Sequence, residues 1–540
     1  MPVASRGLWL ITSGAYVSQE LAAEFGQLPP SFLPLGTRRL YEYHLELTGH
    51  GTPVYLTLPE GFEIPDEDRR RLEFLGATPL LVPEGLTLGE SVLFALNLIG
   101  GADQPVRILH GDTLVDKCLP DELDRIGVAT SSEGYSWAVV KLDGDRIADM
   151  QTVEAGASND ASVPIACGYF AFSRSMALVR SLTRARGKFV EGILDYAKSH
   201  PLFSTRINSW YDFGHVQTFF RSRRIMTSAR HFNDMRIDGR TARKSSEDVA
   251  KIRAEANWLE NVPSSLRIFT ARLIDAGNQD DGRAFYETEY GYLPTLSELF
   301  VYGRLGTSAW GEILNSCRDF LTASTKARTA SPADALLREL TSAKTAARLQ
   351  QFTDQTGFNI GRMLHYGATP LPSLTQIAED VVQHIDFSSG RRACVMHGDF
   401  CFSNILYDSR MRRIRVIDPR GYVAANQPST AGDIRYDLAK FAHSIVGRYD
   451  QIICGRYRLA APDDTHFFLE CEQAPHHAWL ERQLRDFTVD GLSAGGKEVR
   501  AICVCLFLSM LPLHSDKPER QRAFIANALR LYATLESNTL

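Results

Sequence analysis

The chain has 540 residues, too many for one ordinary hydrophobic core, so its length indicates two or more domains. Hydrophobic residues make up 44% and charged residues 23%, as in soluble globular proteins, and the net charge of −5 argues against nucleic acid as a partner. The nine cysteines form no Cys-x-x-Cys pair, so we expect reduced thiols in a cytoplasmic protein. The chain opens on a predicted strand and not on a signal peptide. Its most apolar run, residues 501–513, is too short to span a membrane, and we expect a buried helix there.

The first part of the chain, residues 1–228, alternates predicted strands with predicted helices. The strands are expected at 8–12, 53–58, 78–82, 106–110 and 137–142, and the helices at 38–47, 66–74 and 90–98. This order predicts a Rossmann-like α/β domain with a mostly parallel sheet covered by helices. In such sheets, ligands bind at the carboxyl ends of the strands.

A different pattern begins near residue 228 and continues to residue 540. Residues 232–237 and 241–244 are typical of two antiparallel strands around an Asp238-Gly239 turn. A helix at 246–259 and a strand at 284–289 follow, and beyond residue 295 the pattern is largely helical. We therefore predict a second domain, residues 229–540, with a small β-rich part and a larger helical part.

One segment, residues 397–421 (HGDFCFSNILYDSRMRRIRVIDPRG), carries the clearest chemical signal. Asp399 follows a predicted strand, Asn404 comes five residues later, and Asp418 follows the next strand, so a hairpin would bring Asp418 beside Asn404. Phosphoryl transfer from ATP needs a carboxylate that orients the attacking hydroxyl and oxygen ligands that hold Mg²⁺. We predict Asp399 as the base and Asn404 and Asp418 as magnesium ligands. The alternative is a hairpin in which these side chains only cap turns.

The same segment resembles the catalytic and metal-binding loops of the aminoglycoside phosphotransferase and choline kinase family, whose pattern H-G-D-x-x-x-x-N followed by I-D is complete here. The resemblance implies a bilobal, protein-kinase-like fold that uses ATP and Mg²⁺, with a β-rich N-lobe and a helical C-lobe. It also implies a strand lysine paired with a helix glutamate, for which Lys244 and Glu255 are the candidates. Glu289 and Tyr290 lie in the run that resembles the adenine-binding hinge.

Two further residues of this domain are singled out by their place in the motif. The run DIRYDLAK at 433–440 is expected to brace the catalytic loop, with Asp437 capping or pairing locally, and a purely structural role is the alternative. Arg420 is expected to contact a phosphate or an anionic substrate, or to form a surface salt bridge.

In the first domain, Gly111-Asp112 follows a predicted strand and Asp212 precedes Gly214. This half resembles the sugar nucleotidyltransferase family, which implies that Asp112 and Asp212 hold Mg²⁺ and that Gly14 lies in the loop for a second nucleoside triphosphate, CTP, UTP or GTP. That loop has no arginine, and Pro30-Ser31 replaces the family's Pro-Lys. The family's later Glu-Lys-Pro is not found near residues 149–153. Arg38, Arg39 and Lys141 are candidate replacements for the missing cations. A domain that only binds a ligand or supports the kinase is the alternative.

Together these signals predict a bifunctional enzyme that acts on a small molecule, with no membrane span and an oligomeric state left open. The kinase would phosphorylate a sugar hydroxyl, and the first domain would couple the phosphate to a nucleotide, giving an NDP-sugar for surface polysaccharide synthesis. Choline or another amino alcohol is an alternative substrate and would need an aromatic cage. Phosphorylation of an aminoglycoside, and a kinase with a non-catalytic first domain, are further alternatives. The candidate cage residues are Trp310, Trp479, Tyr290 and Tyr292.

Overall fold

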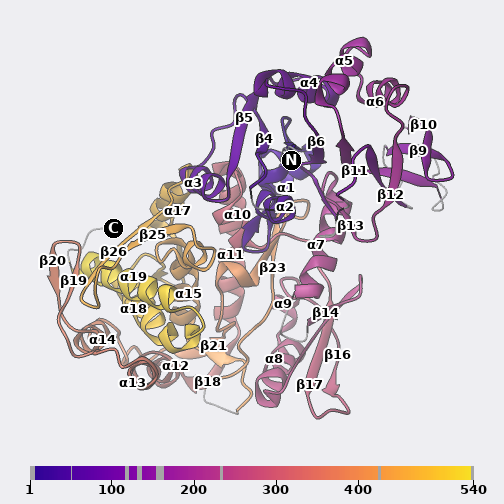
Figure 1. The fold of residues 1–540 in the computed structure, drawn as a ribbon. Coiled ribbons are helices and arrows are strands. Elements are labelled where there is room, and N and C mark those ends of the chain that lie inside the picture. Colours follow the sequence, from indigo (N-terminus) through magenta and orange to yellow (C-terminus); the bar gives the residue numbers. More distant parts are fainter. Residues whose placement is uncertain are drawn as a thin grey trace. The chain divides into compact units, whose positions relative to one another are not determined.

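The structure is a computed structural model, which describes residues 7–49, 51–115, 119, 121–130, 137–153, 163–230, 235–423 and 427–536. The chain is a mixed α/β protein that divides into two compact units, Met1–Arg223 and Arg224–Leu540, close to the boundary expected near residue 228 (Figure 1). Among the described residues, no helix combines the length and apolar character needed to cross a membrane.

Unit 1 is built on a sheet whose described strands run in the order β5-β4-β1-β6-β11-β8-β12-β10-β9. The first four strands of that order are parallel to one another. Their side chains are mostly buried, as expected for a parallel sheet covered on both faces. The strands are β1 (Leu8–Thr12), β4 (Val54–Pro59), β5 (Ala77–Val82), β6 (Val106–His110), β8 (Arg125–Thr130), β9 (Trp137–Asp143), β10 (Arg146–Val153), β11 (Pro164–Phe172) and β12 (Phe203–Arg206).

The expectation of a mostly parallel sheet is wrong for the second half of this sheet. Strand β11 is antiparallel to β6 and to β8, and β10 is antiparallel to β9 and to β12, whereas β12 is parallel to β8. A parallel neighbour needs a long crossover connection, usually a helix, whereas β9 and β10 are joined by a short turn at Gly144, whose φ is +63°. The chain therefore has to return antiparallel there.

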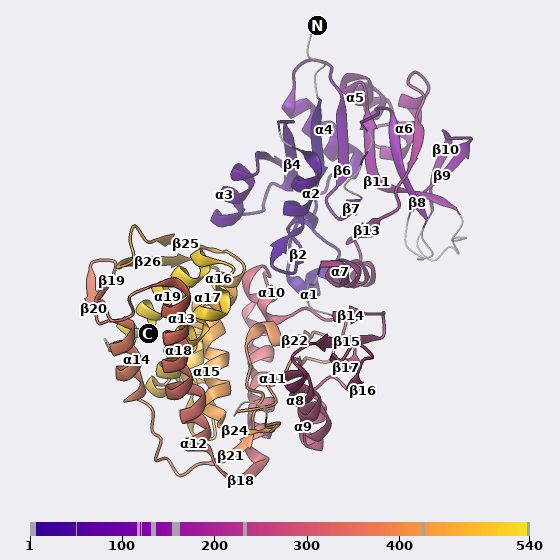
Figure 2. The same cartoon turned by 60° about the horizontal axis from the view of Figure 1, so that its bottom comes forward.

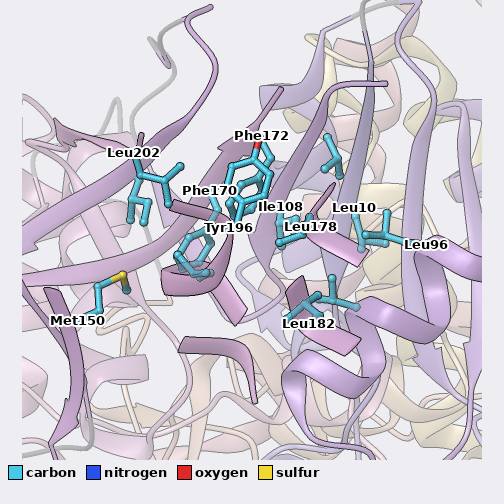
Figure 3. Close-up of a cluster of buried hydrophobic side chains, with 14 of the residues drawn as sticks. Leu10, Leu96, Ile108, Met150, Phe170, Phe172, Leu178, Leu182, Tyr196 and Leu202 are labelled. Carbon is cyan, nitrogen blue, oxygen red and sulfur yellow. The ribbon is translucent and has the colours of Figure 1, made fainter. Parts of the chain in front are cut away.

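Helices cover the sheet of unit 1 and complete its core. Helices α4 (Leu88–Ile99), α5 (Ser175–Arg184) and α6 (Phe189–Ala197) pack against one another (Figure 1). Their apolar side chains meet those of the strands in one buried cluster (Figure 3). The remaining described α-helices of this unit are α1 (Gln19–Phe25), α2 (Leu40–Thr48), α3 (Asp66–Phe74) and α7 (Val216–Arg230), the last of which continues into unit 2.

Unit 2 begins with a small antiparallel sheet in the order β14-β15-β17-β16. Strand β14 (Met235–Ile237) covers the second half of the strand predicted at 232–237, and residues 232–234 lie outside the described residues. The turn to β15 (Thr241–Ser246) contains Gly239, whose φ of +108° favours glycine. Helix α8 (Val249–Asn261) packs against β15, β16 (Leu273–Asn278) and β17 (Ala284–Glu289).

The rest of unit 2 is mainly helical, as the sequence pattern predicts. Helix α18 (Lys497–Met510) is buried along most of its length, which confirms the buried helix expected at 501–513, and it packs against α13, α15 and α19 (Figure 2). The other main helices are α10 (Leu296–Val301), α11 (Thr307–Lys326), α13 (Lys344–Thr356), α14 (Leu374–Val382), α15 (Ile434–Ile445), α17 (Pro475–Asp486) and α19 (Pro518–Glu536). Short strands lie between the helices, namely β18 (Arg328–Pro332), β19 (Leu364–Tyr366), β20 (Thr369–Leu371), β21 (Arg392–Val395), β22 (Ile405–Asp408), β23 (Arg413–Val416), β24 (Ala431–Gly432), β25 (Tyr457–Ala460) and β26 (His466–Cys471).

Candidate active sites

The loop that carries Asp399 is hydrogen-bonded to a buried carboxylate on α15. Asp437 Oδ2 accepts the backbone N–H of His397, and its Oδ1 accepts that of Gly398, both at 2.7 Å. Gly398 has φ +78°, and a Cβ there would lie 2.6 Å from Arg420 Cβ, so only glycine fits the turn. The structure thus places Asp437 where a brace of the catalytic loop was expected.

Asp399 is oriented by two side chains. Its Oδ2 accepts a hydrogen bond from Asn404 Nδ2 at 2.9 Å, and its Oδ1 lies 2.8 Å from Lys440 Nζ. Burial would raise the pKa of Asp399, but Lys440, helped by His397 and Arg420, holds that pKa well below its usual range. Asp399 therefore stays ionised at working pH, and its side chain remains 40% exposed, open to an incoming hydroxyl.

Asn404 and Asp418 are brought side by side by the predicted hairpin, which pairs β22 with β23. The backbone N–H of Ile417 donates to the carbonyl oxygen of Asn404 at 3.0 Å. Because the Asn404 amide nitrogen is directed to Asp399, its amide oxygen points elsewhere and accepts no hydrogen bond from the described residues. Carboxylate and amide oxygens are hard ligands of the kind Mg²⁺ prefers, so these two residues fit a magnesium site that water and phosphate would complete.

Lys244 links the β-rich part of unit 2 to this hairpin. Its Nζ lies 2.8 Å from Glu255 Oε2 on α8 and 3.2 Å from Asp418 Oδ1. Burial would lower the pKa of Lys244, but the two carboxylates raise it, so the side chain is a fixed cation. The hydroxyl of Tyr286, which lies opposite Lys244 in the sheet, donates to Asp418 Oδ1 at 3.1 Å. The structure thus joins the predicted Lys244–Glu255 pair to a metal-ligand candidate.

The expected hinge residues are engaged with neighbouring strands. Glu289 ends β17, and its Oε1 lies 2.7 Å from Arg415 Nη1 on β23. The backbone N–H of Glu289 donates to the carbonyl oxygen of Arg272, and that of Tyr290 donates to the carbonyl oxygen of Arg240. Neither of these N–H groups is available to an adenine ring. The structure therefore places Glu289 and Tyr290 at the junction of the two parts of unit 2 without showing a contact that would bind a nucleotide.

Two residues of this site were not predicted from the sequence, Lys440 and Tyr286. Lys440 lies three residues after Asp437 on α15, a spacing that puts both side chains on one helix face, so the helical period was a usable signal. Tyr286 could be found only from the pairing of β15 with β17. Of the suggested aromatic cage, Trp310 is fully buried against Phe402 and cannot line an open pocket.

In unit 1, Asp112 and Asp212 line one cavity of about 450 Å³. Strand β13 (Trp210–Asp212) pairs with β7 (Thr113–Val115), which brings Asp212 opposite Thr113. A Cβ on Gly214 would lie 2.7 Å from Asp112 Oδ2 and 3.3 Å from Asp212 Oδ1, so both carboxylates converge on this glycine. Two converging carboxylates fit a magnesium ion that a triphosphate would help to hold. No group of three or more metal-ligating side chains is found among the described residues of the chain.

Gly14, and Ser31, which stands in place of the family's lysine, are both packed against other residues of unit 1. A Cβ on Gly14 would lie 2.5 Å from Val82 Cγ2, and Gly14 is not among the residues that line the cavity. Ser31 is fully buried; its N–H donates to Ser13 Oγ and its hydroxyl donates to the carbonyl oxygen of Gly111. The structure therefore brings the first loop beside Gly111 but does not place Gly14 in the cavity that holds Asp112 and Asp212.

The cations suggested as replacements are already paired elsewhere. Arg39 is buried and its Nη2 lies 3.2 Å from Asp68 Oδ2, Arg38 Nη1 lies 2.7 Å from Glu46 Oε1, and Lys141 Nζ lies 3.5 Å from Asp149 Oδ2. The cavity is instead lined by two other cations, Arg186 and Lys188.

Arg186 and Lys188 line the cavity from the loop between α5 and α6. This loop meets the start of α4 so closely that a Cβ on Gly89 would collide with the carbonyl oxygen of Gly187. Lys188 Nζ also lies 3.4 Å from Glu191 Oε1, and Glu191 lines the same cavity. The only sequence signal for this pair was an Arg-Gly-Lys run, which is too common to identify an anion site.

No protein-family model and no curated protein sequence matches the chain. The solved structures similar to it include a nucleoside-diphosphate-sugar pyrophosphorylase from Vibrio cholerae, 13% identical, covering 40% of this chain and 99% of that one with a TM-score of 0.33. HddC from Yersinia pseudotuberculosis is 15% identical and covers 41% of this chain and 99% of its own, with a TM-score of 0.31. A thermostable mutant of the aminoglycoside phosphotransferase APH(4)-Ia is 14% identical and covers 56% of this chain and 89% of its own, with a TM-score of 0.36. These are the two kinds of enzyme that the motifs resemble, and each likeness covers only part of this chain.

Proposed function

We propose that unit 2 is a kinase that transfers the γ-phosphoryl group of ATP to a hydroxyl group of a small molecule. The observation that carries this proposal is the contact of Lys244 with both Glu255 and Asp418, beside the Asp399–Asn404 pair. A cation for the phosphates, two oxygen ligands for magnesium and a carboxylate for the attacking hydroxyl are the parts that phosphoryl transfer requires.

Each side chain has a definite task in this reaction. Asp399 accepts a hydrogen bond from the substrate hydroxyl and takes its proton as the oxygen attacks the γ-phosphorus, while the bond to the β,γ-bridging oxygen breaks and ADP leaves. Asn404 and Asp418 would hold magnesium, which neutralises charge on the β- and γ-phosphates. Because Lys440 keeps the pKa of Asp399 low, this residue acts mainly by orienting the hydroxyl, and it takes the proton late.

For unit 1 we propose nucleotidyl transfer to the phosphate that the kinase has made. A phosphate oxygen of the product attacks the α-phosphorus of CTP, UTP or GTP, and pyrophosphate leaves. Asp112 and Asp212 converge in the cavity where magnesium would be needed, and Arg186 and Lys188 supply positive charge to the same cavity. With a sugar as the acceptor, the final product is an NDP-sugar suited to surface polysaccharide synthesis in the cytoplasm.

Product analysis by mass spectrometry tests both steps. The full-length protein is incubated with magnesium, ATP and pooled sugars and amino alcohols, with and without CTP, UTP and GTP. We expect a monophosphate that becomes a nucleotide conjugate when one of the three triphosphates is added. Absence of any phosphorylated product would refute the kinase. A monophosphate that accumulates with every triphosphate would show that unit 1 is a binding domain.

Matched variants assign the two reactions to their units. Asp399→Asn should abolish the monophosphate, whereas Asp354→Asn, at an exposed position on α13, should not change it. Asp112→Asn should leave the monophosphate and remove the conjugate, whereas Asp195→Asn, which affects a surface ion pair with Lys198, should leave both. Full phosphate transfer by Asp399→Asn would contradict the catalytic assignment.

A further inference from the structure

Three positively charged side chains lie around Asp399 and Tyr436 in unit 2. Lys440 is paired with Asp399 at 2.8 Å. Lys344 begins α13, directly after the π-helical turn Glu339–Ala343, and its Nζ lies 3.3 Å from the hydroxyl of Tyr436. Arg420 packs on the catalytic loop through the close approach of its side chain to the glycine before Asp399. Single π-turns inside helices often occur at functional positions.

Lys344 contacts one buried hydroxyl, that of Tyr436, and Arg420 and Lys440 act on the same hydroxyl electrostatically. Tyr436 is fully buried and lies on α15 one turn before Lys440. Burial would raise the pKa of Tyr436, but Lys344, Arg420 and Lys440 together lower it below its usual value. All three cations are therefore close enough to Tyr436 to act on the same small region.

Only one of the three cations is neutralised by the protein. Lys440 has Asp399, but among the residues that the structure describes neither Lys344 nor Arg420 has a carboxylate within ion-pair distance. Arg420 uses its Nε to donate to the carbonyl oxygen of Tyr422 and lies 4.7 Å over the ring of the same residue, so its two terminal nitrogens remain for a ligand. Lys344 is half-buried, where an uncompensated charge is unfavourable unless an anion binds beside it.

The position of Lys344 separates this charge from the ATP phosphates. The cation proposed for those phosphates, Lys244, lies on a strand of the β-rich part, next to Asp418. Lys344 belongs to the helical part. Burial and the neighbouring Arg420 and Lys440 lower its pKa, and Tyr436 partly offsets this effect. The uncompensated charge therefore suits the acceptor better than the nucleotide.

We propose that the hydroxyl compound phosphorylated by unit 2 carries a negatively charged group, a carboxylate or a phosphate, which Lys344 and Arg420 bind while Asp399 holds the attacking hydroxyl. This inference rests on the proposed kinase function and narrows its acceptor. An aminoglycoside or choline would bring positive charge to a place that already has two unneutralised cations, so an anionic sugar derivative is favoured over both.

The charge preference is measured on full-length protein with magnesium and ATP, by release of ADP. Acceptors are given as pools that differ in charge: neutral sugars and polyols, their carboxylate derivatives such as glucuronate, their phosphates such as glucose 6-phosphate, and amino sugars and amino alcohols. We expect kcat/KM to be at least about 10-fold higher for an acceptor from one of the two anionic pools than for its neutral counterpart. Equal or better use of a neutral or cationic acceptor would overturn the inference and leave the kinase intact. No ADP release above that of Asp399→Asn with any pool would refute the kinase itself.

A lysine substitution then tests the assigned contact. With the best anionic acceptor, Lys344→Met should raise the KM for the acceptor by about 10- to 100-fold, because a hydrogen bond to a charged group is lost, while the KM for ATP stays unchanged. Lys344→Arg should restore much of the loss, and Lys326→Met, at the exposed end of α11, is the matched control. An unchanged acceptor KM in Lys344→Met, or an equal loss for the neutral counterpart, would show that Lys344 does not bind the anion.

Discussion

Replacing Asp437 by Asn tests whether the buried carboxylate on α15 sets the position of the catalytic base. In the structure, both oxygens of Asp437 accept a backbone N–H of the catalytic loop, from His397 and from Gly398, at 2.7 Å. Asn offers one oxygen and one NH₂ group. One of the two hydrogen bonds is therefore lost, and two donors face each other at a site with no exposure to water.

The size of the effect follows from that geometry. Loss of a hydrogen bond to a charged group, with its buried donor left unpaired, costs about 1.5–3 kcal/mol, so the free energy of unfolding should fall by about that amount. Asp399 follows directly after Gly398, so displacement of the loop should also lower kcat by about 10- to 100-fold. The KM for ATP should change little, because Lys244 and Asp418 lie on other segments.

The pH dependence adds a second readout. Burial raises the pKa of Asp437 to about 7, although the two N–H donors favour its ionised form. Both oxygens can accept a hydrogen bond only in the carboxylate, so we expect the kcat of the wild-type protein to rise with pH through about 7 and that of Asp437→Asn to be flat there. The folded state holds this proton more tightly than the unfolded state, whose pKa is near 3.8. The contribution of Asp437 to stability therefore decreases as the pH rises from about 3.8 to about 7. The expected rise in kcat therefore cannot come from greater stability of the fold.

The assay is ADP release between about pH 6 and pH 8.5, combined with urea unfolding at the two ends of this range. Asp354→Asn, on an exposed helix face, is the control. A variant Asp437→Asn with the kcat, the pH profile and the urea midpoint of the wild-type protein would refute the reasoning.

Three further predictions follow from single contacts. Lys244→Met should raise the KM for ATP by about 10- to 100-fold in steady-state kinetics, while Lys251→Met on the exposed face of α8 should not. A wild-type KM for ATP in Lys244→Met would contradict the assignment of Lys244 to the ATP phosphates. Gly421→Ala should lower the thermal midpoint and kcat together, because Gly421 has φ +69° and its added Cβ would collide with the carbonyl oxygen of Ala254. A stable, active variant would show that the backbone at Gly421 can move away from Ala254 without loss of function. Burial lowers the pKa of His476 to about 4, against 6.5 when unfolded. Between about pH 4 and pH 6.5 the unfolded state therefore binds more protons, and the stability contributed by this group is lost as the pH falls, by about 1.4 kcal/mol per pH unit. Urea unfolding of His476→Gln should show a shallower dependence of the free energy of unfolding on pH over this range.

Local patterns in the sequence were sufficient for much of the fold. Strands β1, β6 and β17 and helix α3 have the bounds expected from the sequence. The strands are runs of continuous or alternating apolar residues, whereas α3 is a charged segment that begins after Pro65 and ends before the turn at Gly76. Apart from β21 and the β22–β23 hairpin around the catalytic segment, the short strands among the helices of unit 2 were not predicted, because two to six residues carry too little periodicity. The antiparallel half of the sheet in unit 1 was also missed, since the direction of a strand depends on its connection and not on its own residues.

The sequence by itself determined the chemical types and the spacing of the phosphoryl-transfer residues. Asp399, Asn404 and Asp418 lie within one hairpin, so their proximity follows from a local turn and from strand pairing over a few residues. Only the tertiary structure decided which distant groups meet them. The contact of Lys244 with Asp418 joins a strand to a loop across the two parts of unit 2, and Lys344 reaches Tyr436 from another helix. Contacts between residues so far apart in the chain depend on packing between elements, and no local period in the sequence encodes them.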